Sequence, residues 1–371
     1  MSIQDQCDQV NAQMAAWMAD DPRRLQLLAE LIVAIPLSRS LQSADIAEHI
    51  LRDVQDSSIA QMLRRFYMNT AVSWEKYYVP FLQQLLRHLT VSRYTLIFDT
   101  TDIGPAHRAV GLSLAYQQRS LPLVWHIEPG RKGHTRTAIQ VQLVQQLTQH
   151  LTFTQSVLFL GDGEFDGVPL LQLFDTLGWD FVCRTSPTVY IYPPDQPGFP
   201  LRDLVPAPDC PAQEWADVAF TTQYQFGPVH CYTCWETPHT APLLLIYRLT
   251  TSETPRAAYQ PRFWTEPLFR DCKEGGFRLN TTPMQQPERL SRLLLVVATA
   301  YLWLTCVGAS VIATGVAATV DRAKRRTLSV FKTGWRWFKR QHKLGHSVTF
   351  TFKLPHPFIL PPLRYLKPKL E

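Results

Sequence analysis

The chain has 371 residues, of which 46% are hydrophobic and 18% are charged, and its net charge is +6. This composition excludes a disordered tail and predicts a globular protein with room for two or three domains. Thirteen Lys and Arg and no Asp or Glu lie between Arg322 and Lys369, so the rest of the chain is net negative. Seven scattered cysteines and a polar start without a signal peptide predict reduced thiols in the cytoplasm.

The first 90 residues have a helical pattern and are predicted to form a helical N-terminal DNA-binding region, residues 1–90. Two short capped helices are expected over Ser43–Leu51 and Asp56–Arg65. Such a pair is as typical of a small helical bundle packed on a core as of a helix-turn-helix motif. If it is a helix-turn-helix motif, Ser57, Arg64 and Arg65 are the expected DNA contacts.

Residues 91–185 change to a strand pattern, with three strands in succession followed by alternating helices and strands. The expected elements are strands 94–98, 111–116 and 121–127, helix 135–150, strand 157–161, helix 168–177 and strand 181–184. The order βββαβαβ is the layout of an RNase H-like core. It predicts an α/β fold with a mixed sheet that has helices on its faces.

The remainder of the chain divides into three further segments. Residues 186–256 begin with many prolines and continue as strands, which predicts a β-rich insertion. Trp215 and Trp235 lie in this insertion. A role in the core is favoured for them, and stacking on an extruded base is the alternative. Residues 257–320 are expected to complete the core with a glutamate-bearing helix and a buried helix, and residues 321–371 form a basic C-terminal segment.

Candidate metal-binding carboxylates occur where two apolar strands stop, at Asp99 and Asp162. This edge of a sheet is where α/β proteins place their chemistry, although an aspartate after a strand is often only a cap or turn residue. In a helix, Arg262, Glu266 and Lys273 would project from one face. A Pro directly after the glutamate indicates that the helix begins near Glu266, which weakens the one-face argument for Arg262.

These motifs resemble those of the IS4-type DDE transposases of bacterial insertion sequences. The resemblance rests on the signature Tyr-x2-Arg-x3-Glu-x6-Lys, matched by Tyr259, Arg262, Glu266 and Lys273. It also rests on four segments in the same order along the chain: Asp99-Thr-Thr-Asp102, Ser120-Leu-Pro-Leu-Val-Trp125, Leu160-Gly-Asp162-Gly-Glu-Phe165 and Gly178-Trp-Asp-Phe-Val-Cys-Arg184. The sequence departs from the family pattern at Thr265, where an aliphatic residue is expected, and at Pro267.

The resemblance implies metal-dependent cleavage at insertion-sequence ends and transfer of the freed 3′-OH into target DNA. Asp99, Asp162 and Glu266 are then the catalytic ligands of two Mg²⁺ ions, with Mn²⁺ as a substitute. The implied partners are double-stranded DNA, as terminal inverted repeats and target, and a second copy in a synaptic homodimer at the bacterial nucleoid. The neighbouring carboxylates that could replace a ligand are Asp102, Glu164, Asp166 and Glu274. The implied DNA contacts near the site are Tyr259, Arg262, Lys273 and Arg184.

Two other functions remain open for the same fold. One is a structure-selective RNase H-like nuclease without strand transfer, and the other is a catalytically decayed DNA-binding protein. In the basic segment, cations alternate with aromatic residues, which suits phosphate contacts and stacking, although a solvated basic helix would have a similar pattern. The expected DNA contacts there are Arg325, Arg326, Lys339 and Arg340.

Two patterns point to other classes of protein. The run from Leu293 to Val320 carries no charge and is long enough to cross a bilayer. Its hydroxyl residues and two glycines favour a buried helix instead, so no membrane partner is expected. Cys231 and Cys234 have a zinc-compatible spacing with His230 and Cys210 nearby, but a second pair of ligands is missing and two ordinary strand cysteines are expected.

Overall fold

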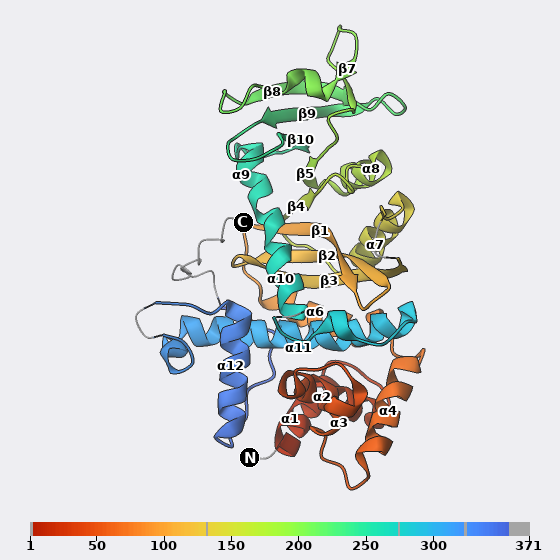
Figure 1. The fold of residues 1–371 in the computed structure, drawn as a ribbon, viewed down its shortest axis with the longest axis vertical. Helices are drawn as coiled ribbons and strands as arrows, with labels where there is room; N and C mark the ends of the chain where they lie inside the picture. Colours follow the sequence, from red (N-terminus) through yellow and green to blue (C-terminus); the bar gives the residue numbers. More distant parts are fainter. Residues whose placement is uncertain (1–2, 131–132, 274, 323–324, 356–371) are drawn as a thin grey trace.

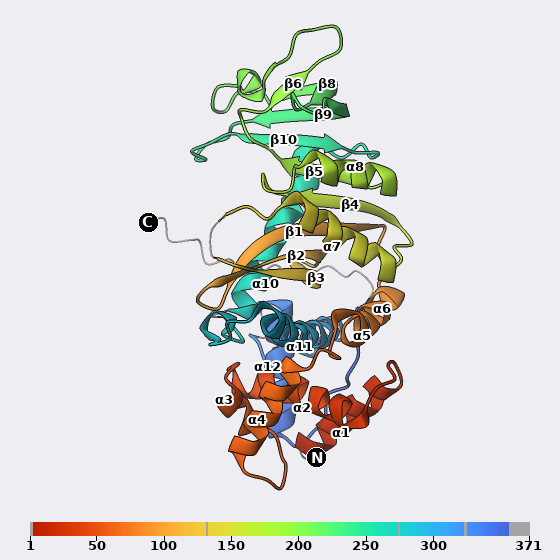
Figure 2. The same ribbon diagram turned by 90° about the vertical axis from the view of Figure 1, so that its right-hand side faces the viewer.

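The computed structural model describes residues 3–130, 133–273, 275–322 and 325–355. The molecule is elongated and has three stacked parts (Figures 1 and 2): helices at the N-terminal end, a central sheet with its helices, and further strands at the opposite end. One long helix, α11, lies across the molecule between the central sheet and the N-terminal helices.

A single ten-stranded sheet runs through the central and upper parts, in the order β3-β2-β1-β4-β5-β10-β9-β8-β6-β7. Its first half consists of β1 (Arg93–Ile103), β2 (His107–Tyr116), β3 (Arg119–Pro129), β4 (Ser156–Gly161) and β5 (Asp180–Arg184). β1, β2 and β3 form an antiparallel meander, while β1, β4 and β5 are parallel. This arrangement confirms the predicted mixed α/β fold and is consistent with an RNase H-like core.

The second half of the sheet is formed by the β-rich segment. Its strands are β6 (Tyr190–Tyr192), β7 (Phe199–Pro200), β8 (Gln213–Phe220), β9 (Phe226–Cys234) and β10 (Leu243–Arg248). β10 pairs antiparallel with β5, with Leu245 opposite Arg184, so the segment extends the core sheet directly. Cys231 and Cys234 lie on β9, and no group of three metal-binding side chains occurs among the described residues.

The helices cover the sheet and build the N-terminal part. Those next to the sheet are α7 (Thr137–His150) and α8 (Val168–Leu177), and those of the N-terminal part are α1 (Ile3–Ala15), α2 (Pro22–Ser38), α3 (Ser43–Ala47), α4 (Asp56–Met68), α5 (Trp74–Tyr77) and α6 (Val79–His88). α3 and α4 begin where the sequence predicts. Their expected side-chain caps are absent, because Gln42 and Gln55 occupy the cap positions without capping hydrogen bonds. α3 is also shorter than expected.

The uncharged run forms α11 (Pro287–Ala313), followed by a short 3₁₀ turn, η4 (Val316–Thr319). α11 is long and apolar enough to cross a membrane, yet 89% of its most apolar 18-residue stretch is buried inside the protein. Its side chains face the central sheet on one side and N-terminal helices on the other. The run is therefore a buried core helix, as the sequence analysis favours.

The basic segment contains α12 (Val330–Lys343), which packs on α11. Trp335 and Phe338 are buried, and the indole Nε1 of Trp335 donates a hydrogen bond of 2.8 Å to the carbonyl oxygen of Pro36. These two rings are therefore part of the core, and the prediction that the aromatic residues of this segment stack on bases is wrong for them. The amphipathic pattern of α12 arises because its aromatic face is needed to cover α11.

α11 and α12 approach closely at two glycines. A Cβ atom on Gly308 would lie 1.9 Å from the carbonyl oxygen of Val330, and one on Gly334 would lie 1.8 Å from that of Leu304. Both distances are far below van der Waals contact, and both obstacles are backbone atoms. The two helices can therefore pack only if neither position carries a side chain.

We expect Gly308→Ala to lower the free energy of unfolding by about 3 kcal/mol, because the two backbones must separate and lose packed surface. Urea denaturation would measure the change. Ser310→Ala on the exposed side of the same helix serves as a control and should change the stability by less than about 0.5 kcal/mol. An unchanged Gly308→Ala midpoint would contradict the close helix contact.

Candidate active site

Two aspartates meet at the edge of the sheet because their strands are neighbours in register. β1 and β4 are parallel, with Ile97 opposite Leu160. Asp99 and Asp162 each follow two residues later, so continuing this register places them opposite one another on the same face of the sheet. The sequence predicts that Asp99 follows its strand. In the structure it lies inside β1, because β1 continues to pair with β2 as far as Ile103. Asp162 follows β4 as predicted.

A helical segment passes over these aspartates. It consists of α9 (Pro255–Tyr259), the 3₁₀ turn η2 (Gln260–Trp264) and α10 (Thr265–Cys272), and it runs along the front of the sheet in Figure 1. The helix containing Glu266 therefore begins at Thr265, as Pro267 indicates. Arg262 belongs to the preceding turn, and its position is set by this turn rather than by the face of α10.

Arg262 joins the two aspartates. Its Nη2 atom lies 3.1 Å from Oδ1 of Asp99 and 2.8 Å from Oδ2 of Asp162. The side chains of Arg262 and Asp99 are 13% and 11% exposed, whereas that of Asp162 is 35% exposed, so solvent reaches the pair from the Asp162 side. Burial opposes the charge of Arg262, but Asp99 and the other anionic neighbours outweigh it and raise the pKa of Arg262. One positive charge thus compensates two converging carboxylates.

Asp99 is fixed by further hydrogen bonds. The hydroxyl of Thr265 donates to its Oδ2 atom, and the backbone N–H of Thr100 donates to Oδ1 at 2.9 Å. Burial raises the pKa of Asp99 above the usual aspartate value, although Arg262 and Thr265 act to lower it. Thr265 is buried at the first position of α10, where it couples the glutamate helix to the central strand.

Glu266 is the third predicted carboxylate, and it lies in the first turn of α10 with an exposed side chain. Its charge acts on Arg262, which places it in the electrostatic environment of the aspartate pair. Within the described ranges, however, three candidate ligands do not converge on one point. The structure therefore brings Asp99 and Asp162 together and places Glu266 beside them without completing a three-ligand cluster.

The neighbouring carboxylates have other partners. Glu164 accepts hydrogen bonds from the hydroxyl of Thr100 at 3.3 Å and from the backbone N–H of Thr135. Asp166 accepts one from the hydroxyl of Thr185 at 2.6 Å, and burial raises its pKa. Asp102 is half-buried near the end of β1. Glu274 lies outside the described residues.

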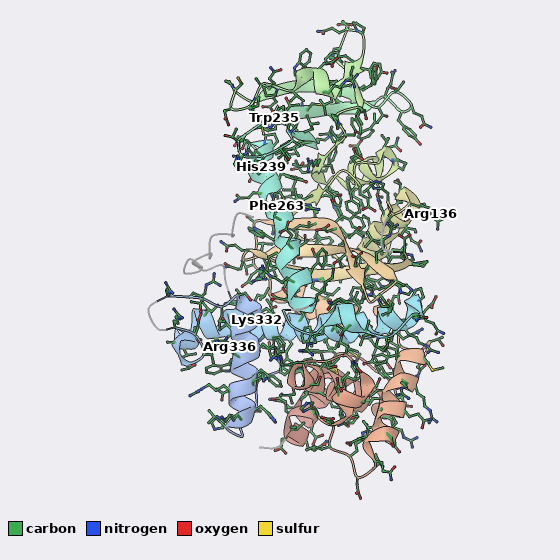
Figure 3. All side chains as sticks on the ribbon, in the orientation of Figure 1. Arg136, Trp235, His239, Phe263, Lys332 and Arg336 are labelled. Atoms are coloured by element: carbon green, nitrogen blue, oxygen red, sulfur yellow. The ribbon has the colours of Figure 1, made fainter. Side chains whose placement is uncertain are left out.

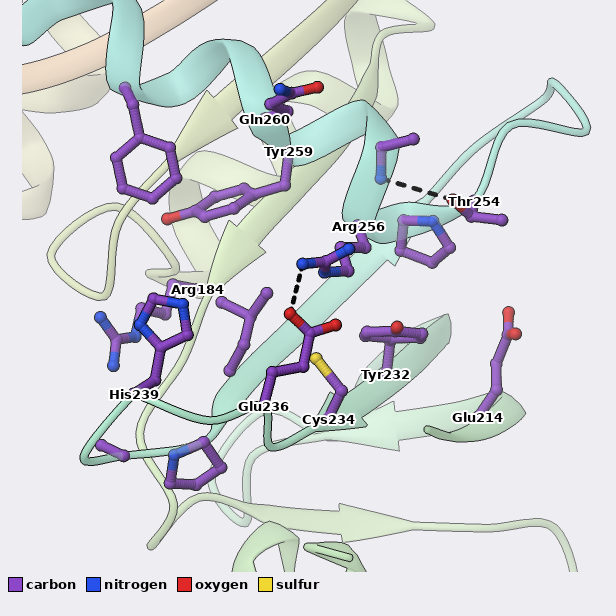
Figure 4. Close-up of a pocket in the computed structure, with 16 residues that line it drawn as sticks. Arg184, Glu214, Tyr232, Cys234, Glu236, His239, Thr254, Arg256, Tyr259 and Gln260 are labelled. Atoms are coloured by element: carbon purple, nitrogen blue, oxygen red, sulfur yellow. Dashed lines mark hydrogen bonds and ion pairs between the residues drawn. The ribbon is translucent and has the colours of Figure 1, made fainter. Parts of the chain in front are cut away.

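A cavity of about 790 Å³ opens between the upper strands and the α9–η2 segment, and neither aspartate is among the residues that line it (Figure 4). Tyr259, Arg184 and Phe263 line it, together with Glu236 and Arg256, which form an ion pair. Tyr259 is buried and Arg184 is exposed at the end of β5. Two of the residues expected to contact DNA thus share this cavity.

Comparison with known proteins identifies the family. Residues 93–303, more than half of the chain, match the model of the transposase DDE domain. The chain belongs to the DDE transposases. No curated protein sequence matches it significantly. Among solved structures it is similar to the piggyBac transposase in a synaptic complex with hairpin DNA, with a TM-score of 0.44 and 11% identity over 96% of this chain and 83% of that one.

The matched range of this DDE transposase contains Asp99, Asp162 and Glu266. The protein is an enzyme that acts on DNA, and its domain belongs to a class that generally uses divalent metal ions. The residues present fit such ions, because Asp99 and Asp162 supply carboxylate oxygens, the ligands that hard cations prefer. Both carboxylates already face the same positively charged group, Nη2 of Arg262.

The other candidate DNA contacts of the transposase differ in exposure. Lys273 is half-buried at the end of α10, in a small cavity that Asp99 also lines. A DNA contact is expected to be exposed to solvent. Arg326 is buried, so the structure does not support its predicted role. The exposed candidates, whose role stays a prediction, are Arg64, Arg65, Arg325, Lys339 and Arg340.

Thr265 appears in the sequence analysis only as a departure from the family pattern, whereas the structure gives it a specific contact. We expect Thr265→Val to lower the cleavage rate by about tenfold to a hundredfold, since a hydrogen bond to a charged group contributes about 1.5–3 kcal/mol. Thr265→Ser retains the hydroxyl and should retain most of the rate. Equal losses in both variants would show that packing, not the hydrogen bond, is what matters.

Proposed function

We propose that this DDE transposase is of the IS4 type and that it cleaves insertion-sequence ends and transfers the freed 3′-OH into target DNA. The observation that carries the proposal is the convergence of Asp99 and Asp162 on Arg262, within a segment that has the Tyr-x2-Arg-x3-Glu-x6-Lys spacing. An arginine held by two carboxylates at an open edge is available for a substrate phosphate, which offers it an alternative anionic partner.

Asp99, Asp162 and Glu266 would hold the divalent ions, which we propose to be two Mg²⁺ with Mn²⁺ as a substitute. Bound divalent ions make an attacking oxygen more nucleophilic and stabilise the leaving oxygen of a phosphodiester. Thr265 keeps the Asp99 carboxylate oriented, and burial of Asp99 excludes water from one side of the pair. Water is the first nucleophile and the freed 3′-OH is the second, and both reactions use the same site.

Arg262, Tyr259 and Lys273 would hold the phosphates around the cleaved bond, and Arg184 would extend this contact along the cavity. Arg262 is the first to change partners, because a phosphate approaching from the exposed Asp162 side meets its guanidinium. The cavity of about 790 Å³ beside Tyr259 has room for a displaced nucleotide. We propose that it receives one when the end is opened.

The partners of the reaction are double-stranded DNA with terminal inverted repeats, a target DNA and a second copy of the chain. Two ends must be held together for joint transfer, which makes a homodimer the simplest synaptic unit. We further propose that the protein acts in the bacterial cytoplasm, at the nucleoid. Sedimentation of the protein with and without a duplex that carries the end tests the dimer.

Glu266→Gln tests the function most directly. We expect the natural chain to nick a labelled duplex that carries the ends flanking the gene when Mg²⁺ is present. The nicking should be lost when EDTA removes the metal, and it should also be lost in Glu266→Gln. Joining of the cut end to a second duplex distinguishes a transposase from a nuclease that lacks strand transfer. Binding without cleavage by the natural chain would instead favour a decayed DNA-binding protein.

A further inference from the structure

Four cations gather around the C-terminal end of α10, and none of them is among the DNA contacts expected from sequence. We call Arg39, Arg270, Lys332 and Arg336 the basic strip. Arg270 is on α10, Arg39 directly follows α2, and Lys332 and Arg336 are one turn apart on α12. Arg39, Arg270 and Arg336 are exposed, and Lys332 is half-buried.

The strip is assembled around one buried ring. Trp335 is held by its hydrogen bond to Pro36 and by stacking on Phe277, whose centroid is 5.5 Å away. The ammonium of Lys332 lies 4.7 Å from the centroid of Trp335, and the guanidinium of Arg39 lies 5.7 Å from it. Cation–π contacts thus fix two cations from opposite ends of the chain beside each other.

The positive charge of the strip is only partly balanced by Asp271, which already has a cationic partner. Asp271 is buried and forms an ion pair of 2.8 Å with Arg119. Burial lowers the pKa of Lys332, Asp271 raises it, and the charges of Arg39, Arg336 and Arg119 lower it further. Crowding of like charges destabilises the strip unless an external anion binds there.

The strip continues from the active site on the same side of the molecule. Arg270 follows Glu266 by four residues, which is one helical turn, or about 6 Å along α10. Figure 3 shows Lys332 and Arg336 beside the lower end of α10, on the side that also carries Phe263.

We propose that the basic strip binds the phosphate backbone of the DNA duplex that continues beyond the cleaved bond. This inference rests on the proposed function, because it takes the DNA to be seated at Asp99 and Asp162. The strip joins the N-terminal helices, α10 and α12 into one DNA-binding surface. Contacts to phosphates position the duplex and carry no sequence information, so this surface would bind DNA of any sequence.

The test compares the salt dependence of DNA binding in EDTA for the natural chain and the triple variant Arg39→Gln, Arg270→Gln and Arg336→Gln. Each lost phosphate contact should reduce the slope of log K against log salt by about 0.9, so the triple variant should lose about 2.7. The same loss is expected for duplexes with and without an insertion-sequence end. Lys332→Gln, measured separately because the Lys332 ammonium lies over the buried Trp335 ring, should lose about 0.9.

A matched control changes three other exposed arginines, Arg23→Gln, Arg87→Gln and Arg202→Gln, with the same change in net charge. We expect its slope to equal that of the natural chain, and thermal melting to show both triple variants folded. Equal slopes for all three proteins, with end cleavage intact in Mg²⁺, would overturn the basic strip and leave the proposed function standing. A natural chain that neither binds nor cuts the end would overturn both.

Discussion

Asp99→Asn and Asp162→Asn are each expected to reduce cleavage of the end by at least about a thousandfold, equivalent to about 4 kcal/mol of barrier. Both substitutions keep the side-chain volume. Each removes one of the two carboxylate charges that contact Nη2 of Arg262. Single-turnover cleavage in Mg²⁺ would measure the loss. Binding of the duplex in EDTA should survive, because removal of a carboxylate does not weaken the attraction to phosphate.

Asp102→Asn is the matched comparison for this result. Asp102 is on the same strand as Asp99, but three residues further along, so it faces the opposite side of the sheet. It should cleave at nearly the natural rate. A large loss in Asp102→Asn together with activity in Asp99→Asn would move the catalytic position along β1 and contradict the assignment.

The aspartate pair could be predicted because its signals are local. An apolar run of four or five residues ending in Asp marks a buried strand and its edge, and two such runs with a helix between them imply parallel neighbours. The register of β1 and β4 then places Asp99 opposite Asp162. The prediction that Asp99 follows its strand was wrong because pairing with β2 extends β1 through polar residues that have no strand pattern.

The contacts that sequence could not predict join segments far apart in the chain. The pairing of β10 with β5 extends the core sheet, yet local pattern shows only that both are strands. Trp335 and Phe338 have cationic neighbours that suggest a surface role, and their burial depends on the glycine contact between α11 and α12. Arg262 has a helical spacing to Glu266, but a 3₁₀ turn, not α10, directs it between the aspartates.

Arg262→Gln is expected to have opposite effects on metal binding and on catalysis. In the absence of DNA, the guanidinium neutralises Asp99 and Asp162 from about 3 Å and repels any other cation there. Its removal should therefore strengthen Mn²⁺ binding to the DNA-free protein by about tenfold or more, a difference of about 1.4 kcal/mol. End cleavage should nevertheless fall, because the variant lacks a phosphate contact at the cleaved bond.

Electron paramagnetic resonance of free Mn²⁺ measures the first effect without any turnover. Arg184→Gln is the control, since Arg184 at the end of β5 is another candidate DNA contact but has no ion pair with either aspartate among the described residues. It should leave Mn²⁺ binding unchanged. In the natural chain, duplex DNA should strengthen Mn²⁺ binding by drawing Arg262 onto a phosphate, and in Arg262→Gln this gain should disappear. If DNA strengthens Mn²⁺ binding equally in both proteins, Arg262 does not couple DNA binding to metal binding.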